Sequence, residues 1–167
     1  MTKKSVGRVC ISVAAALAVL YSAPEPEAEA IEQPVPFSHR VHSEVGIKCR
    51  NCHSLKDGFA AGLPPETTCM ACHATVKKDS PAIRKLAEFA RSKEPVPWKR
   101  VYEVPEYVWF SHQSHHVDAK IACEHCHGPV ATRDVIVKEK PTSMQACMDC
   151  HAAYKAPNGC DFCHNTQ

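Results

Sequence analysis

The chain has 167 residues, a formal net charge of +2 and 11 cysteines. This length allows one or two small domains. The 20 basic residues form no long block, so the composition gives no support to nucleic-acid binding. Aromatic residues make up only 7% of the chain and 13 prolines interrupt it, which excludes a large core built from side chains alone. The fold is therefore expected to depend on covalent cross-links or on a bound cofactor for its stability.

The first thirty residues have the pattern of an export segment. Three basic residues precede an apolar run over 9–23, and an Ala-x-Ala sequence follows at 28–30. As a helix this run would span about 22 Å, less than the roughly 30 Å hydrocarbon core of a bilayer. The pattern favours a cleaved signal peptide over 1–30 and export to the periplasm. If the segment is retained as an N-terminal anchor, the protein would stay attached to the cytoplasmic membrane.

All ten cysteines that follow this segment fall in C-x-x-C-H motifs, of which there are five. Two thiols at this spacing can each form a thioether with one vinyl group of the same haem, and the adjacent histidine then binds the iron. Zinc ribbons, redox-active cysteine pairs and secreted disulfides also use paired cysteines, but none requires a histidine after every second cysteine. With histidine at 11 of 167 positions, five chance matches have a likelihood of about one in a million.

The motifs therefore predict five covalently attached haem c groups. The haems are expected on Cys49 and Cys52, on Cys69 and Cys72, on Cys123 and Cys126, on Cys147 and Cys150, and on Cys160 and Cys163. The proximal iron ligands are expected to be His53, His73, His127, His151 and His164. With this many haems on a short chain, the macrocycles themselves should form the core. The expected fold is mostly irregular with small α-helices at the motifs, a multihaem cytochrome c fold in which the chain wraps its cofactors.

Six of the eleven histidines are not the final residue of a C-x-x-C-H motif. These six are candidates for the second, distal iron ligands. Four of them form an internal repeat, Phe-Ser-His-x-x-His, at 37–42 just before the first motif and at 110–115 just before the third. The repeat and the motifs together resemble the class III multihaem cytochromes c, over about 35–73 and 108–164. In that family the two histidines of such a segment bind two different haems.

The resemblance implies a distal role for each histidine of the repeat. His39 would bind the haem on the first motif and His112 the haem on the third, while His42 and His115 would cross to other haems of their own modules. The fifth distal ligand falls outside the repeat. His125 lies between its own two cysteines and is expected to face solvent, and Met70 and Met148 are expected to pack.

Two residues remain for the fifth distal position, Met144 and His116. Met144 lies just before the fourth motif, and thioether ligation would raise that haem's potential. His116 directly follows His115. The sequence leaves the choice between them open.

The motif spacing divides the chain into a dihaem module at 31–79, a connector at 80–106 and a trihaem module at 107–167. Within the connector, Ser80 and Pro81 predict a helix start. An apolar face at positions 83, 86, 87 and 90 predicts a helix that Pro95 and Pro97 end. This face is expected to cover a haem edge or the module junction. A short β-ribbon between 108–110 and 135–137 is also expected.

A narrower resemblance involves the connector from Val96 to Tyr102, the segment 105–112, the run at 126–130 and the Met144 segment. These are similar to the pentahaem cytochrome subunit of alternative complex III, which implies a respiratory electron carrier between a membrane quinol-linked donor and another redox protein. The alternative is a multihaem reductase with one open iron, which needs nearby acid and base groups. Since enough distal ligands exist to fill every iron, an electron carrier without its own catalytic site is favoured.

Overall fold

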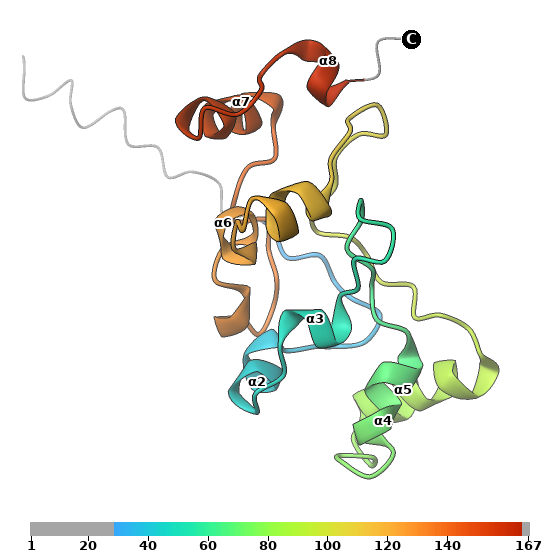
Figure 1. Ribbon diagram of the computed structural model, residues 1–167. Coiled ribbons are helices and arrows are strands. Elements are labelled where there is room, and N and C mark those ends of the chain that lie inside the picture. The colour runs from blue at the N-terminus through green and yellow to red at the C-terminus, as the bar shows by residue number, and fades with distance from the viewer. Residues whose placement is uncertain (1–28, 165–167) are drawn as a thin grey trace, which may run out of the picture.

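The computed structural model describes residues 29–164. Residues 1–28 of the predicted signal peptide therefore lie outside the described residues. Short helices joined by long irregular segments make up this part of the chain (Figure 1). The elements are α2 (His39–Glu44), α3 (Cys49–Cys52), α4 (Glu66–His73), α5 (Pro81–Ser92), the π-helical turn η2 (Gln113–Asp118), α6 (Cys123–His127), the 3-10 turn η3 (Val130–Thr132), α7 (Met144–Ala153) and α8 (Cys160–Cys163). The predicted mostly irregular, small α-helical fold is confirmed.

Each C-x-x-C-H motif contains a helical turn. The helices α3, α6 and α8 begin at the first cysteine of their motifs, and α4 and α7 begin one turn or less earlier. Residues three positions apart lie on one face of a helix, so both thiols of a motif point to the same side. This local geometry follows from the spacing alone.

The predicted connector helix is present as α5. The Ser80 hydroxyl accepts a hydrogen bond from the Ile83 N–H at 3.2 Å, and Pro81 occupies the first turn. The helix ends at Ser92 because Lys93 adopts a left-handed conformation with φ of 59°, two residues before Pro95. The start signal is confirmed, and the end is set by a left-handed residue just ahead of the prolines.

The apolar face of α5 packs on α4, the helix that contains the second motif. Leu86 is buried together with Val35 and Val96, and Cys69 and Met70 of α4 pack against this cluster. The expected packing role of Met70 is confirmed. The face therefore packs directly on a motif helix.

Only these three apolar residues are buried among residues 29–164. Several large apolar side chains are instead more than half exposed, with Trp109 and Tyr107 at 65% and Phe162 at 62%. Exposed apolar side chains of this size are typical of a surface that a bound apolar group or a partner covers. The structure thus agrees with the expectation that the polypeptide has little core of its own.

The predicted β-ribbon is wrong. Val108 forms an isolated antiparallel bridge with His164, and the Trp109 N–H donates to the Cys163 carbonyl at 2.8 Å. The β-branched run at 135–137 is irregular, and no strand forms within 29–164. Residues 108–109 pair instead with the last motif, which lies beside them in the folded chain. Local strand propensity does not predict a contact between segments so far apart in sequence.

The two repeat segments are each held by the other half of the chain. In the first, Arg40 forms an ion pair with Asp134 at 3.0 Å, and the Ser38 hydroxyl donates to the same carboxylate at 2.6 Å. In the second, the N–H groups of His112 and Gln113 donate to carbonyls at Phe59 and Gly58. Each repeat is therefore fixed by a segment that follows a motif of the other module.

Candidate haem-binding sites

The ten motif thiols within the described residues are all free, and every motif presents one exposed and one half-buried thiol. The exposed thiols are those of Cys49, Cys72, Cys126, Cys147 and Cys160, and the half-buried ones are those of Cys52, Cys69, Cys123, Cys150 and Cys163. The exposed member is the first cysteine in the first, fourth and fifth motifs and the second cysteine in the other two. The structure thus places all ten predicted attachment residues at the surface of a helical turn or just beneath it.

Burial raises the pKa of three of the half-buried thiols, those of Cys52, Cys69 and Cys123. Burial raises the pKa of the Cys52 thiol, and the Cys49 thiol beside it raises it further. Two thiols on one side of a helical turn, with one member open to solvent, suit attachment to the two vinyl groups of a haem.

Four pairs of imidazole rings face one another across a gap. The ring centres of His39 and His53 lie 6.4 Å apart with planes 7° from parallel, and those of His112 and His127 lie 6.3 Å apart at 3°. Each of these pairs joins the first histidine of a repeat to the motif histidine that follows it in sequence.

The second histidines of the repeats face different motifs. The ring of His42 lies 6.1 Å from that of His73 at 64°, and the ring of His115 lies 5.9 Å from that of His151 at 42°. The structure thus brings His42 to the second motif, next to Cys72, and His115 to the fourth, next to Cys150. This is the crossed arrangement that the family resemblance implies.

The gap between the rings has the size of a metal with two nitrogen ligands. A metal–nitrogen bond of about 2.0 Å on each side, with each nitrogen about 1.1 Å from its ring centre, separates the centres by about 6.2 Å. The four observed separations, 5.9–6.4 Å, bracket this value. The residues present therefore fit an iron held by two imidazoles in four places.

Most of these imidazoles have a fixed tautomer. Eight histidines place Nδ1 against a backbone carbonyl, which can only accept, so Nδ1 carries the proton and Nε2 keeps its lone pair for a metal. The partners are Ser38 for His42, Gly62 for His53, Val76 for His73, Phe59 for His112, Ser111 for His115, Ile121 for His116, Pro157 for His151 and Tyr107 for His164, at 2.6–3.4 Å.

The rings at the centre of the molecule are held neutral. Burial, together with the nearby rings of His53 and His42, lowers the pKa of His39 to about 4. Burial likewise lowers the pKa of His127, assisted by His112 and His53. A neutral imidazole is the form that binds a metal, so these sites are prepared for ligation at neutral pH.

The fifth motif histidine has no facing imidazole within the described residues. The aromatic ring near His164 is that of Tyr107. The backbone carbonyl of Tyr107 lies 3.4 Å from Nδ1 of His164. Of the two candidates for the fifth distal ligand, His116 is half-buried with its Nδ1 bonded to Ile121 at 2.9 Å, whereas Met144 is 66% exposed. His125 is exposed, as expected.

Tyr102 is a residue of this site that the motifs do not indicate. Its ring stands edge-on to that of His127 at 4.6 Å, and its hydroxyl donates to the His127 carbonyl at 3.5 Å. The same oxygen accepts from the N–H groups of Glu139 and Lys140 at 3.0 and 3.2 Å. Tyr102 thereby ties the connector to the third motif. Its place in the connector resemblance was the only sequence signal for it.

The motif helices follow one another across the molecule in an order that differs from the sequence. Figure 1 shows α4 and α3 in its lower half, α6 above them and α7 and α8 at the top. The thiols of neighbouring helices are close enough to affect one another: besides burial, Cys49 raises the pKa of Cys123, and Cys163 raises that of Cys147. The Cys150 thiol likewise adds to burial in raising the pKa of Cys126. The Cys52 thiol also adds to burial in raising the pKa of Cys69, so the motif helices lie in the order second, first, third, fourth, fifth.

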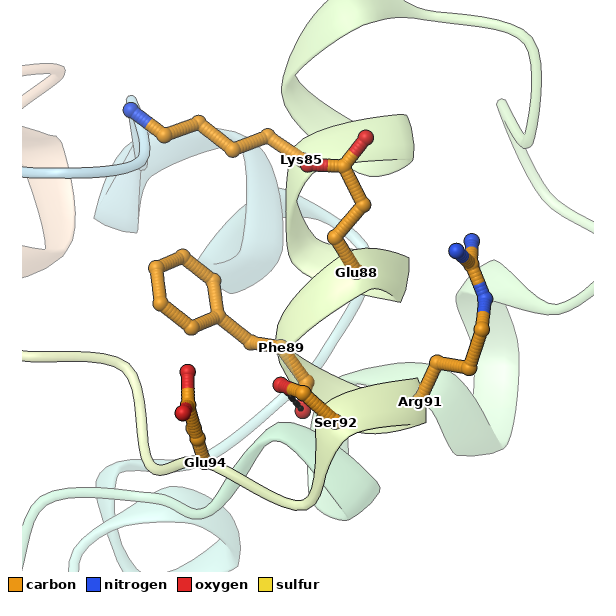
Figure 2. Close-up of a pocket in the computed structure, with 6 residues that line it drawn as sticks. All are labelled: Lys85, Glu88, Phe89, Arg91, Ser92 and Glu94. Atoms are coloured by element: carbon orange, nitrogen blue, oxygen red, sulfur yellow. Dashed lines mark hydrogen bonds between the residues drawn. The ribbon is translucent and has the colours of Figure 1, made fainter.

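A surface recess of about 490 Å³ lies along α5. Figure 2 shows its lining, in which Phe89 lies among charged side chains such as Lys85 and Glu94. The recess is lined by no histidine or cysteine. It therefore contains none of the predicted haem ligands or attachment residues.

Comparison with known proteins agrees with this geometry. Residues 17–94, which include the first two motifs, match the Class III cytochrome C family. The chain is also 33% identical over 161 residues to a protein of Nitratidesulfovibrio vulgaris described as "Menaquinone reductase, multiheme cytochrome c subunit", over 80% of this chain and 77% of that relative. The chain therefore belongs to the class III cytochrome c family and is a multihaem cytochrome c, with covalently bound haem and a function in electron transfer.

Proposed function

We propose that the protein is an exported, periplasmic pentahaem cytochrome c that relays single electrons between a menaquinone-linked membrane complex and another redox protein. The four facing histidine pairs support this most directly. An iron with an imidazole on each side has no position open to a reactant, so it exchanges electrons without binding substrate. The quinone-linked partner is supported by the printed description of the Nitratidesulfovibrio relative.

The polypeptide's part in this function is to hold the haems in a fixed order and to set their potentials. When bound, each haem supplies a one-electron iron couple. The spatial order of the motif helices supports a series in which a haem on α4 would lie at one end and a haem on α8 at the other. We assign the two ends as the contact points for the two partners. The haem of α6, at the centre, connects the dihaem module at 31–79 with the trihaem module at 107–167.

The haem count can be measured directly. Holoprotein made with export and haem attachment should contain five covalently bound haems, because each of the five motifs has two cysteines and a histidine at the spacing for haem attachment. Pyridine haemochrome absorbance per mole of protein, with intact mass, gives the number. The double variant Cys160→Ala/Cys163→Ala should lose one haem and keep the other four. Fewer than five haems in the unsubstituted protein would contradict the pentahaem proposal.

For the fifth distal ligand we propose His116. Its Nδ1 is bonded to a carbonyl, as in the other candidate ligands, whereas the side chain of Met144 extends into solvent from the first turn of α7. His116→Ala should open one iron, so that about one carbon monoxide binds per protein. Met144→Ala should leave the spectra unchanged, and the oxidised protein should lack the long-wavelength band of methionine-ligated iron.

The reverse result, with that band present and lost in Met144→Ala, would assign the site to the thioether. The missing imidazole opposite His164 is also the one observation that favours the reductase alternative. If the unsubstituted protein already binds one carbon monoxide, the fifth iron is open and the reductase gains support. An unreactive unsubstituted protein supports the electron carrier.

A further inference from the structure

A single loop contacts histidines that belong to two different haem sites. The loop runs from Ser54 to Gly62, directly after the first motif, and the Gly62 N–H closes it by donating to the Ser54 carbonyl at 2.8 Å. At its closed end, the Gly62 carbonyl accepts from Nδ1 of His53 at 2.9 Å. At its tip, the Phe59 carbonyl accepts from Nδ1 of His112 at 2.7 Å.

The contact at the tip involves the backbone around His112 as well as its ring. The His112 N–H also donates to the Phe59 carbonyl, at 3.2 Å, and the Gln113 N–H donates to the Gly58 carbonyl at 2.8 Å. The Ser111 hydroxyl donates to the Gly58 carbonyl at 3.1 Å. Two carbonyls of the loop thus receive four hydrogen bonds from three consecutive residues, which determines both the position and the rotation of the imidazole.

The close approach depends on glycine at position 58. Gly58 has φ of +77°, a conformation that side-chain-bearing residues rarely adopt. A Cβ there would lie 3.3 Å from the Gln113 Cβ, so the two segments would have to separate by a few tenths of an ångström. Gly46 has a similar φ of +89°, but a Cβ at that position would meet nothing within 4 Å. The two glycines therefore share the backbone requirement and differ in the contact.

We infer that the loop 54–62 is a positioning element for the third haem, although its residues lie between the first and second motifs. The hydrogen bond from Nδ1 of a ligating histidine sets the ring's orientation and its strength as a donor. Here that bond comes from a loop whose other end orients the proximal ligand of the first haem. One element thus sets one ligand at each of two adjacent haems. This inference rests on the proposed function.

The ring angles provide a readout for single haems. Near-parallel imidazole planes act on the same iron d orbital and give a rhombic ferric EPR spectrum, whereas crossed planes leave two d orbitals close in energy and give a strongly anisotropic one. The pairs at His39 and His112 are near-parallel, at 7° and 3°, so they should give the rhombic signals. The signal of the third haem is the rhombic one that His112→Ala removes.

The test compares Gly58→Ala with Gly46→Ala in the fully loaded protein. Gly58→Ala should shift the g values and the reduction potential of the third haem, with five haems still attached and the other signals unchanged. Gly46→Ala carries the same backbone strain without the contact, so it should leave the third haem unshifted. The double variant Gly58→Ala/Gln113→Gly removes the opposing Cβ and should move the signal back toward that of the unsubstituted protein.

Equal effects of the two glycine variants, or a shift at another haem in place of the third, would overturn the inference. If Gly58→Ala does not accumulate, Ser111→Ala removes one bond to the loop without touching a glycine. Its control is Ser38→Ala. The Ser38 hydroxyl accepts from the Val41 N–H as the Ser111 hydroxyl accepts from the Ser114 N–H, but Ser38 does not contact the loop. Only Ser111→Ala should shift the third haem. Failure of the proposed function would show separately, as an unsubstituted protein without rhombic low-spin signals.

Discussion

Production of the chain without export and haem attachment should yield a polypeptide that does not fold. Among residues 29–164 the only buried apolar side chains are those of Val35, Leu86 and Val96. The apolar surface of three side chains cannot offset the entropy of ordering a chain of this length. Haem attachment would supply the missing core, as a structural metal does in small metal-binding domains. Far-ultraviolet circular dichroism and limited proteolysis should report a disordered, rapidly cleaved chain.

The position of a missing haem should matter as well. Replacing Cys123 and Cys126 with alanine removes the central haem, where the connector and both modules meet, and should cause a larger loss of protease resistance than the Cys160→Ala/Cys163→Ala variant at the end of the series. A compact apoprotein with a cooperative unfolding transition would contradict the prediction. So would equal protease resistance of the two variants.

Replacement of His42 should disturb the haem of the second motif and spare the haem attached directly downstream. The His42 ring faces His73 across a 6.1 Å gap, whereas the ring that faces His53 is that of His39. Without the imidazole, the second iron loses one ligand and should become high-spin and reactive to carbon monoxide. In the second repeat, His115→Ala should act in the same way on the haem of His151.

The control for this prediction is His39→Ala, from the same helix. The planes of the His42–His73 pair cross at 64° and those of the His39–His53 pair lie within 7° of parallel. His42→Ala should therefore remove a strongly anisotropic ferric EPR signal, and His39→Ala a rhombic one. If both variants affect the same haem, or if His42→Ala removes a rhombic signal, the crossed arrangement is wrong.

The haem-binding chemistry and the local helices could be predicted from the sequence because both depend on short-range geometry. A C-x-x-C spacing places two thiols on one face of a turn wherever it occurs, and Ser80 followed by Pro81 starts a helix without help from distant residues. The scarcity of a core could be predicted in the same way, since composition limits how much apolar surface the chain can bury. The crossed use of the two repeats came from the family resemblance.

Contacts between segments far apart in the chain depended on the tertiary structure. The bond from His112 to Phe59 spans 53 positions and that from Arg40 to Asp134 spans 94, and no local pattern indicates either partner. The return of the last motif to Val108 replaced the expected ribbon for the same reason. By itself the sequence determined which residues can bind haem. Only the packing of distant loops decided which imidazole faces which, because one iron site needs ligands from two segments whose approach is set by the whole chain.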